Sequence, residues 1–139
     1  YLELEQIRFG KRLQTEIEIA PETKDVLVPS FILQTLVENC IKHGIAKILY
    51  EGFVSIKSYL DDDFLVCKVY DNGPGIDLSR IYKSTGLSNS ISRLEKLYDL
   101  KNLLEFENTG DGTLVTMRIP LPNSPHLSEE ARARGQIHK

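Results

Sequence analysis

The run PSFILQTLVENCIKHG at residues 29–44 carries polar side chains suited to binding a charged ligand. Its apolar residues recur at helical spacing, so the run is predicted to form one amphipathic helix. Asn39 and His43 then share one margin of the apolar stripe. An amide at that margin costs about 1–3 kcal/mol if its hydrogen bonds are not made, so a polar group is expected to lie against it.

Glu38 and Lys42 form a second pair at i, i+4, nearer the back of the same helix. One interpretation is an exposed ion pair, which stabilises a helix by only about 0.3–0.5 kcal/mol. The other is a functional role for both charges. The helix alone leaves these two interpretations open.

The glycine loop DNGPGI at residues 71–76 directly follows an apolar run at 64–70. A strand at 64–70 would fix Asp71 at its end, which suits a carboxylate that recognises a ligand. Gly73 and Gly75 allow a positive φ and a close approach of ligand to backbone. An ordinary turn is the alternative. A dinucleotide fingerprint fails because a third glycine is missing, and a calcium-repeat pattern is matched only once.

Two further glycine elements follow along the chain. STGLSN at residues 84–89 opens a helical pattern, where free N–H groups and the helix dipole favour a phosphate, although a plain N-cap is the alternative. GDGT at residues 110–113 is on its own merely a hairpin turn.

The remaining periodicities predict the elements that position these residues. We expect a half-buried strand at 13–20, a hairpin of strands at 53–60 and 64–70, a helix from near residue 86 to 100, and a second hairpin of strands at 103–107 and 114–119. This order lacks regular β-α alternation. It is best met by an α+β, two-layer sandwich in which helices cover one face of a mixed, mostly antiparallel sheet.

Composition limits the class of protein. A length of 139 residues predicts one domain, and a net charge of -3 without a basic stripe argues against a nucleic-acid partner. Cys40 and Cys67 have neither metal-ligand nor disulfide spacing and are expected to be buried, reduced thiols. No apolar run approaches a membrane span, so this segment is not expected to insert into a membrane. The chain begins without Met, and we expect it to be part of a longer protein.

Four motifs in this order resemble the Bergerat ATP-binding fold, which gyrase, heat-shock 90 chaperones, histidine kinases and mismatch-repair ATPases share. Residues 38–44 resemble its N-box, 71–76 its first glycine box, 84–89 its second, and Gly112-Thr113 its final strand signature. The run at 1–9, the pattern LVEN-x-IKHG and the later RLEKLY most resemble sensor histidine kinases of the autolysin-sensor type.

The resemblance implies ATP and Mg²⁺ as cofactors and a role for each matching residue. The implied metal ligand is Asn39, and Lys42 and His43 would lie beside the phosphates and ribose. Asp71 would accept a hydrogen bond from the adenine amino group, helped by Thr113. The base would be lined by Gly73, Gly75 and Ile76, and the N–H groups of Gly86 and Leu87 would face the phosphates. The catalytic candidates are Asn39, Lys42 and Glu38, although Glu38 lies about 100° from Asn39 around the helix.

Two positions depart from the family pattern. Ser84 stands where many relatives have a glycine in the second box, and Thr35 stands where relatives that hydrolyse ATP have a water-activating glutamate. The Thr35 departure favours phosphoryl transfer to a histidine over hydrolysis. The resemblance implies that the acceptor histidine lies upstream, in a helical dimerisation region. Of the histidines here, His43 would belong to the nucleotide site, and His126 and His138 lie in the tail.

The resemblance also implies an organisation and partners. Residues 1–10 would end a connector from an upstream dimerisation region, and 11–121 would form the ATP-binding catalytic domain. Three prolines followed by a charged run from residue 120 onward predict a flexible tail at 122–139. The expected partners are the upstream histidine-bearing domain, a second copy in a homodimer, and a response regulator receiver domain. The segment is expected to be a cytoplasmic part of a membrane protein. An anti-sigma-type serine kinase and a degenerate nucleotide-binding interaction module are the alternatives.

Overall fold

The structure is a computed structural model, and it describes residues 13–23, 30–45, 50–75, 77, 85–122 and 124–131. Within these residues the chain forms β1 (Leu13–Ile19), α2 (Ser30–Asn39), β2 (Gly52–Asp61), β3 (Phe64–Asp71), α3 (Thr85–Tyr98), β4 (Leu104–Asn108) and β5 (Thr113–Pro120). A short 3-10 turn at Pro21–Thr23 follows β1.

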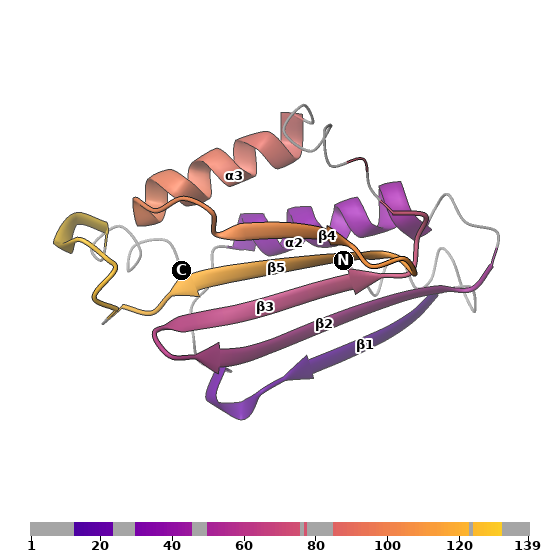
Figure 1. The fold of residues 1–139 in the computed structure, drawn as a ribbon, viewed down its shortest axis with the longest axis horizontal. Coiled ribbons are helices and arrows are strands. Elements are labelled where there is room, and N and C mark those ends of the chain that lie inside the picture. Colours follow the sequence, from indigo (N-terminus) through magenta and orange to yellow (C-terminus); the bar gives the residue numbers. More distant parts are fainter. Residues whose placement is uncertain are drawn as a thin grey trace.

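The described strands form one sheet in the order β1-β2-β3-β5-β4. β1 runs parallel to β2, and the other neighbouring pairs are antiparallel. Figure 1 shows α2 and α3 on the same face of this sheet. The predicted α+β sandwich, with its mixed and mostly antiparallel sheet and its two hairpins, is confirmed.

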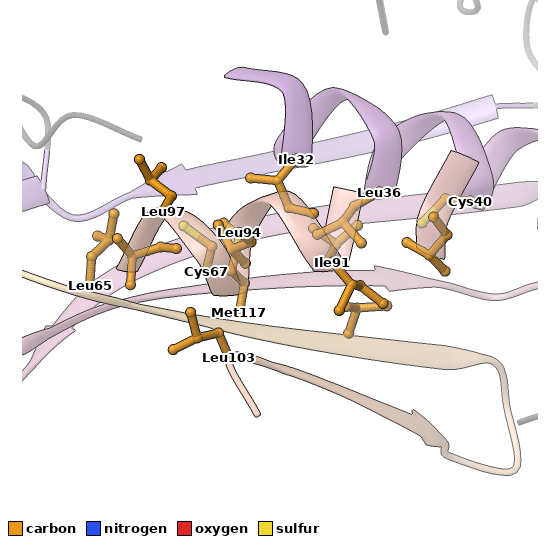
Figure 2. Close-up of a cluster of buried hydrophobic side chains, with 14 of the residues drawn as sticks. Ile32, Leu36, Cys40, Leu65, Cys67, Ile91, Leu94, Leu97, Leu103 and Met117 are labelled. Carbon is orange, nitrogen blue, oxygen red and sulfur yellow. The ribbon is translucent and has the colours of Figure 1, made fainter. Parts of the chain in front are cut away.

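The core lies between the two helices and the sheet (Figure 2). The predicted apolar face of α3 is confirmed, because all of its residues are buried: Leu87, Ile91, Leu94, Leu97 and Tyr98. The apolar stripe predicted for the helix at 29–44 consists of Leu33, Leu36, Val37, Cys40 and Ile41, and all of these are buried except Leu33, which is only partly covered. Ile32, which that stripe omitted, is fully buried as well. The periodicity therefore identified the faces that pack together.

β1 lies at one edge of the sheet, and its predicted half-burial is wrong. Leu13 is buried, but the six residues after it are exposed, with Ile17 at 56% and Ile19 at 55%. Alternation of apolar and polar residues shows which side chains share a face of a strand. It does not show whether another layer covers that face.

The predicted helix at 29–44 is present from Ser30 but changes its winding near its end. The α-helix ends at Asn39, and the chain continues as a π-helical turn, Cys40–Gly44. Such turns are rare and are often found at functional sites. Because the chain winds less tightly here, the angle between Asn39 and His43 inferred from a 3.6-residue period does not hold across this turn.

The structure does not describe the expected connector at the start of the chain, but it describes part of the expected tail. The expected connector at 1–10 lies outside the described residues, and so does most of the loop at 76–84. Part of the expected tail is packed, since Leu127 and Ala131 are buried in the core. The packed part of the chain therefore extends beyond the expected boundary at residue 121.

Two expectations from composition were tested by the structure. Cys40 and Cys67 are both buried and free, as predicted. Among the described residues, none of the helices has the length and apolar character needed to cross a bilayer.

Candidate functional site

Asp71 is the last residue of β3, and only 5% of its surface is exposed. The Gly73 main-chain N–H donates a hydrogen bond to Asp71 Oδ1 at 2.9 Å. Burial raises the pKa of Asp71 above its ordinary value of 3.8, while the Gly73 N–H and the nearby Cys40 thiol oppose the rise. A carboxylate offers about four acceptor positions, so the Gly73 donor leaves Asp71 able to accept from a ligand.

Thr113 lies beside Asp71 on the neighbouring strand. It begins β5, is buried, and pairs with Asp71 in the antiparallel register. Gly112 makes this approach possible, because a Cβ there would lie 2.9 Å from the Asn72 Cα and would overlap the Asp71 carbonyl. The structure thus brings together the two residues that the sequence associates with the adenine.

The glycines of the first box act in different ways. Gly75 has a φ of +95°, which favours glycine, and a Cβ there would lie 3.1 Å from Asn108 Oδ1. Gly73 is not among the described residues with positive φ, and its contribution is the N–H that binds Asp71. Ile76 lies outside the described residues.

Asn72 fixes this glycine box to the start of β2, a role that the sequence-based reasoning missed. Its Oδ1 accepts from the Phe53 N–H at 2.7 Å, and its Nδ2 donates to the Glu51 carbonyl at 2.9 Å. The Tyr50 hydroxyl donates to the Asn72 carbonyl at 2.8 Å. The preference of Asn for side-chain bonding to nearby backbone was a signal, but it did not specify a partner on another strand.

Asn39 ends α2, and its side chain is half-buried. Its Nδ2 is buried, and within the described part of the chain it has no hydrogen-bond partner. An unsatisfied buried donor costs about 1–3 kcal/mol, so a ligand with an acceptor oxygen would stabilise this arrangement. Lys42 follows in the π-helical turn and is exposed. His43 lies in the same turn, but its side chain is outside the described part.

Glu38 has a surface partner on its own helix. Its carboxylate accepts a hydrogen bond from Gln34 Nε2 at 3.0 Å. Between the described side chains of Glu38 and Lys42 the structure contains no ion pair. The contact with Gln34 gives no support to a catalytic role for Glu38.

Two contacts show how α2 lies against α3. Thr35 Oγ1 lies 3.3 Å from Ser90 Oγ, and the Arg93 guanidinium lies 4.0 Å from the centre of the Phe31 ring. The contact that lies later along α2 lies earlier along α3, so the two helices are antiparallel. One more turn in each helix brings the Asn39 end of α2 beside the first turn of α3 (Figure 1).

The first turn of α3 supplies backbone donors. The helix begins at Thr85, so Gly86 and Leu87 lie among the residues whose N–H groups have no partner within a helix. The Leu87 side chain is buried in the core, which anchors this turn. A helix N-terminus attracts anions through its N–H groups and its dipole.

These features meet at one end of the sandwich, where the end of α2 lies near the end of β3. Cys40 directly follows Asn39 in sequence, and burial together with the neighbouring Asp71 charge raises the pKa of its thiol. The site therefore combines a buried acceptor, an amide and a helix N-terminus. A purine nucleotide with Mg²⁺ offers the matching groups, because Mg²⁺ takes oxygen ligands and is usually shared between one or two side chains and phosphates.

Solved structures of histidine kinases share this fold. The histidine kinase domain of the blue-light activated histidine kinase of Erythrobacter litoralis has a TM-score of 0.70 at 18% identity, over 99% of this chain and 62% of that one. The catalytic domain of histidine kinase ThkA has a TM-score of 0.64 at 22% identity, over 86% of each chain. The fold is therefore that of a histidine kinase catalytic domain.

Sequence similarity gives a narrower result. The chain is 35% identical over 132 residues to sensor protein LytS of Staphylococcus haemolyticus, and 34% identical over 141 residues to sensor histidine kinase/phosphatase LytS of Staphylococcus aureus. Each alignment covers 86% of this chain and 23% of the relative, so the chain spans about a quarter of their length. A scan against models of protein families gives no match. The chain belongs to the sensor histidine kinases, with LytS proteins as relatives, which confirms the resemblance to the autolysin-sensor type.

Proposed function

We propose that this chain binds Mg-ATP as the catalytic domain of a two-component sensor histidine kinase. It transfers the γ-phosphoryl group to a histidine on an upstream domain of the full-length protein. The observation that carries the proposal is the buried Asp71 carboxylate, held at the end of β3 beside Thr113 in a relative of LytS kinases. A buried acceptor at a strand end suits recognition of a donor on a ligand, here the adenine amino group.

The base and the phosphates occupy different parts of this site. Asp71 accepts a hydrogen bond from the adenine amino group, Thr113 supports it, and Gly73, Gly75 and Ile76 line the base. Thr113 lies next to Asp71, and Gly75 holds the backbone in a conformation open to close approach. The adenine therefore lies at the β3 end of the site.

The phosphate end is formed by the last turn of α2 and the first turn of α3. Asn39 Oδ1 would ligate Mg²⁺, and its Nδ2, which has no partner among the described residues, would donate to a phosphate oxygen. Lys42 and His43 lie beside the phosphates and ribose, and the N–H groups of Gly86 and Leu87 bind phosphate oxygens. When bound, Mg²⁺ neutralises phosphate charge, which is much of what phosphoryl transfer requires.

Thr35 supports transfer to an acceptor rather than hydrolysis. Its hydroxyl donates to the Phe31 carbonyl at 2.7 Å and contacts Ser90, so it is engaged in joining the helices. A hydroxyl in this arrangement does not serve as a base for water. The isolated chain is accordingly expected to bind ATP and to turn it over very slowly.

The partners follow from the proposed reaction. The acceptor histidine lies in an upstream dimerisation domain, and the full-length protein is a membrane-anchored homodimer. Histidine kinase ThkA has been solved in complex with response regulator protein TrrA, which supports a receiver domain as the next phosphate acceptor.

Calorimetric titration of the chain with ATP and Mg²⁺ tests nucleotide binding. At a hundredfold excess over its dissociation constant, ATP is expected to stabilise the fold by about 2.7 kcal/mol. Asp71→Asn removes the acceptor for the amino group and is expected to weaken binding by at least about tenfold. Asp61→Asn is the matched control, since Asp61 is half-exposed, pairs with Arg118 and lies at the other end of β2. Equal affinity of the wild type and Asp71→Asn would exclude this role.

Phosphoryl transfer in the full-length protein distinguishes the alternatives. Label from γ-³²P-ATP is expected on a histidine, as an acid-labile phosphoryl group. An acid-stable phosphoserine on a partner would identify the anti-sigma-type kinase instead. Binding of ATP without any transfer would identify a degenerate interaction module.

A further inference from the structure

Asn72 is the residue at which the chain leaves the sheet after β3. Its main-chain N–H still bonds across to β2, donating to the Phe53 carbonyl at 3.1 Å. In an antiparallel ladder, two residues joined in this way normally exchange both of their main-chain hydrogen bonds. Here the Phe53 N–H donates instead to Asn72 Oδ1, at 2.7 Å. The side-chain amide therefore takes the place of the Asn72 main-chain carbonyl, and that carbonyl bonds elsewhere.

The partner of the Asn72 carbonyl is Tyr50, two residues before the start of β2. The Tyr50 hydroxyl donates to it at 2.8 Å, although 55% of the Tyr50 surface is exposed. This carbonyl and the Gly73 N–H belong to one peptide unit, and the Gly73 N–H donates to Asp71 Oδ1 at 2.9 Å. Because a peptide unit is planar, the direction of its carbonyl fixes the direction of its N–H. The Tyr50 hydroxyl thus holds the peptide that binds the Asp71 carboxylate.

The orientation of this peptide affects how the Asp71 carboxylate is turned. The terminal torsion of an Asp side chain is broad, so the side chain alone does not set the plane of its carboxylate. The Gly73 N–H restrains that plane, and it does so more firmly when the same peptide is also bonded at its carbonyl. Hydrogen bonds in such a chain polarise one another, which strengthens the bond to the buried carboxylate. The lone pairs of Asp71 that remain for a ligand are thereby given fixed directions.

We propose that Tyr50 is a positioning residue, whose hydroxyl acts through the peptide that follows Asn72 and orients the Asp71 carboxylate toward the exocyclic amino group of the purine base. This inference rests on the proposed binding of adenine at Asp71. Because a hydrogen bond weakens steeply as its angle is distorted, the hydroxyl determines how strongly the site favours a base that carries this amino group. The role requires no contact between Tyr50 and the nucleotide.

The chain of hydrogen bonds is tested first without nucleotide. Tyr50→Phe removes only the hydroxyl of an exposed side chain, so the variant is expected to fold. The buried Gly73 amide proton is then expected to exchange with solvent at least about threefold faster than in the wild type, and its NMR resonance to move upfield. Tyr59→Phe is the matched control, since Tyr59 lies near the other end of β2 and pairs with Val66. An unchanged Gly73 signal in Tyr50→Phe would overturn the proposal.

Nucleotide affinities then test the effect on specificity. ATP is compared with purine riboside triphosphate, which lacks the amino group but is otherwise matched, by calorimetry with Mg²⁺ on the 139-residue chain. Tyr50→Phe is expected to weaken ATP binding by about threefold to tenfold and purine riboside triphosphate binding by less than about twofold. Tyr59→Phe is expected to leave both affinities unchanged. A merely structural role for the hydroxyl would weaken both nucleotides alike.

A second background shows whether the effect passes through Asp71. In Asp71→Asn, removal of the Tyr50 hydroxyl is expected to have no further effect on ATP affinity, because the acceptor that it orients is already lost. An unchanged ratio of the two affinities in Tyr50→Phe, or an equal loss for both nucleotides, would rule out the role of Tyr50. Failure of the wild type to bind ATP would instead overturn the proposed function, and the specificity role with it. The Gly73 signal would still report whether the hydroxyl holds the peptide.

Discussion

Burial opposes the negative charge of the Asp71 carboxylate, so the stability of the fold is expected to depend on pH. The pKa of Asp71 is raised in the folded chain above its ordinary value of 3.8, chiefly by burial. Between these two values the folded state binds more protons than the unfolded state, so the free energy of unfolding falls as pH rises. Above the raised pKa, Asp71 is deprotonated in both the folded and the unfolded state, so this group no longer changes the free energy of unfolding with pH. Asp71→Asn, which cannot ionise, lacks this contribution.

The prediction is checked by urea unfolding of the wild type and Asp71→Asn from about pH 3.5 to pH 7. The stability of the wild type relative to the variant is expected to fall as pH rises above 3.8 and then to level off. Other groups titrate equally in both proteins and cancel in the difference. A difference that is flat, or that rises with pH, would show that burial does not govern this carboxylate.

At this scale the positions of some residues of the candidate site in the fold could be predicted from the sequence, and those of others could not. Asp71 was predictable because a polar residue that ends an apolar strand before a glycine loop has a fixed place. Asn39 was predictable as an amide beside an apolar stripe. Asn72 was not, because its partners near the start of β2 are distant in the sequence and adjacent only in the fold.

At the scale of elements, the contact between α2 and α3 sets the phosphate end of the site. Thr35 and Ser90 join the helices through their hydroxyls, at a position where hydrolysing relatives carry a glutamate. Thr35→Val keeps the shape of the side chain and removes the hydroxyl. It is expected to lower the free energy of unfolding by about 0.5–1.5 kcal/mol, because the bonds to Phe31 and Ser90 are lost.

A double-mutant cycle with Ser90→Ala checks that the hydroxyls interact. The loss caused by Thr35→Val is expected to be smaller in the Ser90→Ala background, since their shared contact is already absent. Ser92→Ala is the control, because Ser92 is exposed on the same helix. Additive losses for Thr35 and Ser90 would show that this contact contributes nothing to helix packing.

Periodicity predicted the helices and strands better than it predicted which of their faces another layer covers. The apolar face of α3 follows directly from its helical spacing, and each residue is buried as expected. β1 shows the limit, because its alternation is regular although Ile17 and Ile19 are exposed at the edge of the sheet. The π-helical turn at Cys40–Gly44 was also missed, since a fixed period assumes uniform winding.

At the scale of the molecule, the order of elements was enough to predict a sandwich with helices on one face. It was not enough to predict where the packed unit ends. Prolines and charges predicted a flexible tail at 122–139, but the Ser124 N–H donates to the Leu121 carbonyl at 2.9 Å. His126 lies with its ring centre 5.4 Å from that of Phe64. Composition reports average polarity, whereas packing depends on a few well-placed residues.

Leu127 tests whether this segment belongs to the folded unit. It packs in the core with only 8% of its surface exposed. Leu127→Ala therefore removes buried methyl groups and leaves a cavity. The expected loss in the free energy of unfolding is about 2–5 kcal/mol, measured by urea or thermal unfolding. Glu129→Ala, on the exposed side of the same segment, is expected to change it by less than about 0.5 kcal/mol. If the segment were mobile, both substitutions would have equally small effects, because neither side chain would lose a packed neighbour.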